Sequence, residues 1–168
     1  MYGVTKCTKV ARINQKISQN ETEVGKMFTG MSFQNLDAKG RVILSQKFRE
    51  ELGESFFVTS GFNKDFRCIQ IMSAEQFDRL RTQIRALPAD KALQLQYVLI
   101  SPATEVSANS QGRVQIPQAL RESAKLSKEL VVLGMDTRVE VWDKETYDRF
   151  MDKQMQESFQ DALELLRL

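Results

Sequence analysis

The sequence contains no histidine among its 168 residues. Histidine is the usual general base for serine and cysteine nucleophiles, and it is a ligand in most zinc sites. The phosphate-binding patterns GxxxxGK[ST] and, after a predicted strand, GxGxxG are missing as well. The 22 acidic residues are scattered along the chain without a constellation that suggests a catalytic cleft. We therefore predict no enzyme activity, no catalytic residues, no cofactor, no metal site and no small-molecule substrate.

Cysteine is scarce, and long hydrophobic runs are missing. Cys7 and Cys68 are too few for a disulfide framework and are typical of free thiols in a reducing compartment. No apolar run is long enough to span a membrane, and charges interrupt the N-terminus where a signal peptide would be apolar. These absences predict a cytoplasmic protein without a membrane partner.

Neither basic nor acidic residues dominate the sequence, but the net charge is unevenly distributed along it. The net charge of +2 divides into +3 for residues 1–26, +2 for residues 27–101 and −3 for residues 102–168. Nucleic-acid binding, if present, therefore cannot come from a uniformly basic surface. Residues 1–26 lack a hydrophobic period and predict a flexible basic leader. The leader could also be an artefact of start-codon choice, because the patterned sequence begins at Met27.

One stretch of the chain is present twice. Residues 37–50, DAKGRVILSQKFRE, match residues 109–122, NSQGRVQIPQALRE, at six of fourteen positions: Gly, Arg, Val, Gln, Arg and Glu. Further along, CIQIMSAEQF at 68–77 aligns with RVEVWDKETY at 138–147. Two such units are too few for a solenoid, and each is too small to bury its own apolar face. We expect them to pack against each other.

Local signals predict the same order of elements in both copies. In the first copy the predicted elements are a strand ending at Asp37, a turn 37–40, strand 41–44, a helix 46–52 between Ser45 and Gly53, strands 56–58 and 68–71, a helix from the capping box 73–76 through Leu87, and a helix 89–100. In the second copy they are strand 105–107, turn 109–112, strand 113–116, helix 117–124, strands 130–133 and 138–142, a helix capped by Asp143, and an amphipathic tail.

These elements divide the chain into five predicted regions. They are the leader 1–26, a first repeat 31–78, a helical connector 79–102, a second repeat 103–146, and a C-terminal helix and tail 147–168.

The Gly-Arg pair in each turn is the strongest functional candidate. Asp37 precedes Arg41 by four residues, so its carboxylate can hold the guanidinium or cap the amides of the turn. Arginine suits phosphate groups and the O6/N7 edge of guanine. The alternative is a salt-bridged turn without a partner. Packing alone rarely requires the same exposed cation twice, so the repetition favours binding.

From Met27 to about residue 155 the sequence resembles the bacterial MraZ family. The resemblance is carried by Met27-Phe28-Thr29-Gly30, by NLDAKGR at 35–41, by GRVQIP at 112–117 with Leu120-Arg121, and by VLG at 132–134 and VEVW at 139–142. It implies an α+β fold of two tandem AbrB-like swapped-hairpin β-barrel units that form a pseudo-dimer, with flanking helices. It also implies homo-oligomeric rings.

The resemblance further implies a transcriptional regulator that binds double-stranded DNA. The targets expected for the family are short direct repeats in the promoter of a division and cell-wall gene cluster, and the protein is expected at the nucleoid. The DNA-contacting DxxxR motif of the family corresponds to Asp37 and Arg41 in the first copy and to Asn109 and Arg113 in the second. Lys39 and its counterpart Gln111 complete the predicted DNA-binding set.

The second copy departs from the motif. Asn109 cannot form a charge-assisted pair with Arg113, although it can still cap the turn, and Gln111 replaces the cation of Lys39. We therefore expect the first copy to dominate phosphate binding. A different class of function stays open: an antitoxin-like oligomeric module that binds a protein without promoter binding. Its candidate docking segment is the apolar tail bearing Phe159, Leu163 and Leu166.

Overall fold

A computed structural model describes residues 27–63, 65–156 and 159–167. The predicted leader and Cys7 lie outside the described residues. The first copy supplies β1 (Met31–Asn35), β2 (Arg41–Ile43), α2 (Gln46–Leu52), β3 (Phe56–Asn63), β4 (Phe66–Ser73), α3 (Ala74–Arg85), α4 (Ala89–Leu95) and a π-helical turn, η1 (Gln96–Ile100). The second supplies β5 (Thr104–Val106), β6 (Arg113–Gln115), α5 (Gln118–Ser123), β7 (Glu129–Met135), β8 (Arg138–Asp143), α6 (Lys144–Gln156) and α7 (Phe159–Glu164).

Three predicted helix starts are confirmed by side-chain caps. The Ser45 hydroxyl accepts a hydrogen bond from the amide of Phe48 at the start of α2, and Ser73 accepts one from Gln76 at the start of α3. At the start of α6 the carboxylate of Asp143 accepts a bond of 3.2 Å from the amide of Thr146. Each cap satisfies one of the amides that the first turn of a helix leaves unpaired.

Several predicted boundaries were wrong; for example, the strand predicted to end at Asp37 ends at Asn35, and the strand predicted at 68–71 spans Phe66–Ser73. Leu87 lies outside its predicted helix, because α3 ends at Arg85 and the backbone turns before Pro88. The helix 89–100 is α-helical only to Leu95 and continues as η1. The strand predicted at 56–58 extends to Asn63, although Thr59 and Ser60 interrupt its apolar pattern. Burial of Thr59 leaves its hydroxyl group satisfied, since this hydroxyl donates a hydrogen bond of 2.6 Å to the carbonyl of Leu99.

The two copies share one antiparallel sheet. Its strand order is β1-β7-β8-β4-β3-β5, and β2 pairs separately with β6. The order reads the same from either end when each strand is exchanged for its counterpart in the other copy. The first strand of each copy therefore pairs with the other copy: β1 with β7, and β5 with β3. A pseudo-twofold axis relates the halves and passes through the β2–β6 and β4–β8 pairs.

The hydrophobic core is built from both copies. Its largest cluster contains equivalent residues from the two repeats: Val42 with Val114, Leu44 with Ile116, Phe48 with Leu120, Leu52 with Ala124, Phe56 with Leu130, Val58 with Val132, Ile69 with Val139, and Ile71 with Val141. Neither repeat encloses this cluster alone, which agrees with the expectation that the units bury their faces against each other.

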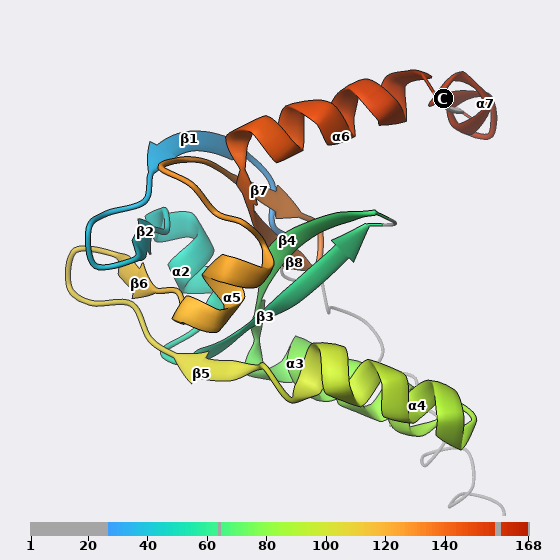
Figure 1. Ribbon diagram of the computed structural model, residues 1–168, viewed down its shortest axis with the longest axis horizontal. Helices are drawn as coiled ribbons and strands as arrows, with labels where there is room; N and C mark the ends of the chain where they lie inside the picture. Colours follow the sequence, from blue (N-terminus) through green and yellow to red (C-terminus); the bar gives the residue numbers. More distant parts are fainter. Residues whose placement is uncertain (1–26, 64, 157–158, 168) are drawn as a thin grey trace, which may run out of the picture.

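Figure 1 shows how this arrangement exposes the repeated turns. The short helices α2 and α5 lie between the β2–β6 ribbon and the larger sheet, so the ribbon is held at one side of the molecule. The α3–α4 pair and the α6–α7 pair project from opposite ends of the sheet. None of the helices in the described ranges has the length and apolar character required to span a bilayer.

Candidate nucleic-acid interface

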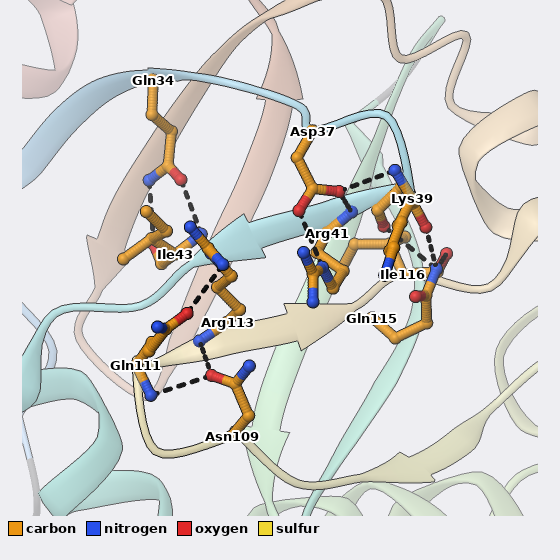
Figure 2. A network of polar contacts seen from close by, with 11 residues as sticks. Gln34, Asp37, Lys39, Arg41, Ile43, Asn109, Gln111, Arg113, Gln115 and Ile116 are labelled. Atoms are coloured by element: carbon orange, nitrogen blue, oxygen red, sulfur yellow. Dashed lines mark hydrogen bonds and ion pairs between the residues drawn. The ribbon is translucent and has the colours of Figure 1, made fainter.

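The first turn is fixed by the carboxylate of Asp37. One oxygen, Oδ1, accepts hydrogen bonds of 2.9 Å from the amides of Lys39 and Arg41. The other, Oδ2, accepts a bond of 2.7 Å from Nε of Arg41. The two roles considered for this carboxylate, holding the guanidinium and capping the amides, are therefore fulfilled at once (Figure 2).

These contacts stabilise the charged form of Asp37. Partial desolvation raises the pKa of this carboxyl, but the hydrogen bonds from the Arg41 amide, the Arg41 guanidinium and the Lys39 amide outweigh it. The net effect holds the pKa of Asp37 below its ordinary value. The aspartate is therefore ionised at neutral pH and can act as a permanent counter-charge for Arg41.

Arg41 keeps part of its binding capacity. Asp37 engages only Nε, and no described residue bonds to either Nη nitrogen. The side chain is 25% exposed. A guanidinium anchored through one edge can still present two parallel N–H groups to a phosphate or to a guanine edge.

The second turn uses different chemistry at the same positions. Oδ1 of Asn109 accepts hydrogen bonds of 3.0 Å from the amide of Gln111 and 2.9 Å from the amide of Arg113. The guanidinium of Arg113 instead donates from Nη1 to Oε1 of Gln111 over 2.7 Å. As expected, Asn109 caps the turn without a charge-assisted pair. The holding of Arg113 by Gln111 was not predicted.

The β2–β6 ribbon brings the two turns into one surface (Figure 2). Val42 pairs with Val114 at its centre, and both side chains are buried. Arg41 pairs with Gln115, and Ile43 pairs with Arg113. Alternation along a strand then places these four side chains on the outer face. All the predicted site residues lie on this ribbon or in its turns.

Gln115 braces the first turn from the opposite strand. Its Nε2 donates to the carbonyl of Lys39 over 2.7 Å and to that of Gly40 over 3.3 Å. The equivalent position in the first copy is Ile43, which is 51% exposed and offers no such bond to the second turn. The first turn is therefore the more firmly held of the two.

A second arginine that is present in both copies lies against the glycine of each turn, and its role was not predicted from the sequence. Gly40 has φ of +74°, and a Cβ added there would lie 2.5 Å from Cζ of Arg121. Nε of Arg121 donates to the carbonyl of Ile116 over 3.0 Å. Arg49 lies equivalently beneath Gly112. The sequence did contain a signal for this role, because Arg49 and Arg121 form one of the six identical positions of the repeat.

The interface offers no metal site. Across 27–63, 65–156 and 159–167, no group of three or more Asp, Glu, Cys or His side chains could hold a metal ion. The available chemistry is that of fixed cations and amides, which favour anions and hydrogen-bonding base edges as ligands.

Comparison with known proteins adds a family to this geometry. The family described as "MraZ protein, putative antitoxin-like" matches twice, at residues 27–95 and 99–167. A relative from Desulforamulus reducens named "Transcriptional regulator MraZ" is 39% identical over 140 residues, which cover 82% of this chain and 96% of the relative. The two matches account for both copies of the repeat. The chain therefore belongs to the MraZ family.

Proposed function

We propose that this protein is a transcriptional regulator that binds DNA sequence-specifically through the two turns of the β2–β6 ribbon. The proposal rests on one observation about the Arg41 guanidinium. Asp37 fixes it through Nε, while both Nη groups stay available to bind a ligand. The naming of the D. reducens relative as a transcriptional regulator supports the same role. The proposed targets are short direct repeats in the promoter of the division and cell-wall gene cluster, which would place the protein at the nucleoid.

Proposed contacts follow from the shape of the ribbon. The major groove of B-DNA admits a two-stranded β-ribbon, and arginine recognises phosphates and the O6/N7 edge of guanine. The proposed DNA-binding residues are Asp37, Lys39 and Arg41 in the first copy and Asn109, Gln111 and Arg113 in the second. The first copy would dominate, because it carries Lys39 and because Asp37 and Gln115 fix its turn.

The ribbon is one part of a larger proposed architecture. The exchange of β1 and β5 between the copies supports a pair of AbrB-like swapped-hairpin units. In this proposal the repeats occupy residues 31–78 and 103–146, joined by the connector 79–102 and followed by the helix and tail 147–168.

Assembly into a ring would compensate for weak binding by one chain. Residues 27–168 carry nineteen basic and twenty acidic residues, so their net charge is −1. Affinity for DNA depends on how many phosphates are neutralised, and linked sites raise avidity by about 10²–10⁴. The projecting α6–α7 arm exposes apolar side chains that would contact a neighbouring copy: Met155, Phe159, Leu163, Leu165 and Leu166.

The proposal is tested by the salt dependence of DNA affinity. Fluorescence anisotropy would measure binding of the full-length protein to a duplex with the promoter repeats, at about 50 mM and about 200 mM salt. We expect specific binding that weakens by about 10³-fold or more between these conditions if six or more phosphates are contacted. A scrambled duplex of the same length is the control. Equal affinity for the two duplexes would contradict sequence-specific regulation.

A second candidate is an antitoxin-like module that binds a protein. The exposed apolar residues of the α6–α7 arm and the antitoxin-like description of the family favour it. The same titration separates the candidates, because this module would bind neither duplex at either salt concentration.

A further inference from the structure

An open cavity of about 520 Å³ lies away from the two turns. It is bordered by Asp65 and the start of β4, by the end of α5 and by the first part of α6. Three cations, Arg67, Lys125 and Arg149, line it together with the hydroxyl groups of Ser123 and Thr146. None of these residues belongs to the ribbon, so the proposed DNA interface does not account for the cluster.

The electrostatics of this cavity favour an anion. Asp65, the one acid among the described residues that line it, is paired with Nζ of Lys153 over 3.3 Å. Neither Lys125 nor Arg149 forms an ion pair with any residue that the structure describes. The hydroxyl of Thr146 donates to Asp143, but three cations and the hydroxyl of Ser123 match the needs of phosphate oxygens.

The pseudo-symmetry shows that this charge is particular to the second copy. Lys125 has a left-handed backbone, with φ of +52°, where the first copy has Gly53. Arg149 corresponds to Arg79, which is paired with Glu75 over 2.6 Å. A lysine at such a position is conformationally unfavourable relative to glycine. A binding role for the ammonium group would explain why a lysine occupies it.

A second open cavity, of about 310 Å³, adjoins the first. Arg67 and Ser123 line both cavities. The second is less charged and contains Tyr97, a residue that is 72% exposed, beside Val98 and Pro102. An exposed aromatic ring next to an arginine is a surface on which a planar base can stack.

We propose that these adjoining cavities bind a free nucleotide. The phosphates would lie among Arg67, Lys125 and Arg149, and the base would lie against Tyr97. The combined size is within the range of about 300–1,000 Å³ that is usual for small-molecule sites. This proposal does not depend on DNA binding by the ribbon, because it uses other residues.

Isothermal titration of the full-length protein with ATP, without DNA, tests the proposal. We expect saturable binding of ATP and weaker binding of pyrophosphate. Arg149→Gln should weaken both by about tenfold or more, since it removes a charge-assisted contact. Tyr97→Ala should weaken ATP binding but leave pyrophosphate binding unchanged. Arg79→Gln, at the equivalent position of the first copy, is the control and should leave both affinities unchanged.

Lys125→Gly gives an independent measurement that separates binding from folding. Glycine relieves the left-handed backbone, so the melting temperature without ligand should rise by about 1–3 °C. The stabilisation that ATP confers should nevertheless be lost or reduced. A variant that melts higher yet binds ATP as well as the unmodified protein would overturn the role of Lys125.

Two further results would contradict the nucleotide site. One is the absence of saturable ATP binding up to about 1 mM, the weak end of common ligand affinities. The other is a loss of duplex affinity in Arg149→Gln without any ATP binding, which would assign the cavity to the DNA interface instead. The duplex titration of each variant therefore accompanies the ATP titration.

Discussion

At the scale of single residues, the two turns carry the same backbone with different side-chain chemistry. The spacing of Asp37 and Arg41 was enough to predict their pairing, because Arg41 directly follows the four-residue turn that Asp37 opens. The roles of Gln111 and Gln115 were not predictable in this way. They depend on a rotamer and on the cross-strand register, and neither is encoded in local spacing.

Exchanging the capping residues of the two turns tests the role of the Asp37 carboxylate. Asp37→Asn should retain the amide caps, as Asn109 does, but lose the charge-assisted bond to Arg41. We expect DNA affinity to fall by about 3–30-fold, since a misaimed arginine loses part of an interaction worth about 1–3 kcal/mol. Anisotropy measures the affinity, and an unchanged thermal melt verifies the fold. The matched variant Asn109→Asp should not weaken binding. Equal losses in the two variants would refute the proposed asymmetry.

Gly40 and Gly53 form a matched pair for measuring the support beneath the first turn. Both have positive φ, but only a Cβ at position 40 would collide with another group, the Arg121 guanidinium. Gly53→Ala should cost about 1–2 kcal/mol from the backbone alone. Gly40→Ala should cost about 1–3 kcal/mol more, because Arg121 must release the Ile116 carbonyl. Urea unfolding measures both, and equal costs would show that Arg121 moves aside freely.

At the scale of elements, type and order were well predicted from the sequence. Caps at Ser45, Ser73 and Asp143 mark helix starts locally, so these starts were predictable. The full length of β3 was not, since the burial of Thr59 depends on a distant carbonyl of η1. The π-helical form of η1 was not foreseen either.

The cap of α6 gives a prediction with a defined pH dependence. Burial raises the pKa of Asp143, but hydrogen bonds from Ser127 and Thr146 outweigh this and hold the pKa below its ordinary value. The stabilisation is therefore present above the unfolded-state pKa of about 4 and is lost as the pH falls through the lower folded-state pKa. Asp143→Ala should cost about 1–2 kcal/mol at neutral pH.

Urea unfolding at neutral and acidic pH measures this difference. The gap in unfolding free energy between Asp143→Ala and the unmodified protein should narrow as the pH falls below about 4. Glu145→Ala, an exposed acid in the same first turn, is the control and should show a smaller gap at neutral pH. A gap at Asp143 that stays constant with pH would argue against stabilisation by the ionised carboxylate.

At the scale of the whole molecule, the repeat produces one fold from two incomplete halves. Its presence in the sequence predicted mutual packing, and the shared core confirms that. The set of strand partners could not be derived from composition or periodicity, because it is a non-local property. Membership of a family of regulators confirms the expectation that the chain is not an enzyme.

Separating the halves tests this interdependence. The fragments 27–102 and 103–168 each lose the partner strands of β1 or β5 and half of the core. Each alone should be unfolded or should self-associate, whereas mixing or co-expression should restore a stable complex. Size-exclusion chromatography with NMR spectra reports both properties. A monomeric fragment with a well-dispersed spectrum would show that one repeat folds by itself.

The central claim, that DNA is bound mainly through the first turn, is tested most directly by comparing Arg41→Ala with Arg113→Ala. Anisotropy on the promoter-repeat duplex gives the affinity of each variant, and size-exclusion chromatography verifies that the oligomer is unchanged. We predict that Arg41→Ala abolishes specific binding and lowers the salt slope by about 1 for each phosphate that the arginine no longer neutralises. Arg113→Ala should have the smaller effect. Unchanged affinity in Arg41→Ala, or an equal or greater loss in Arg113→Ala, would contradict this account.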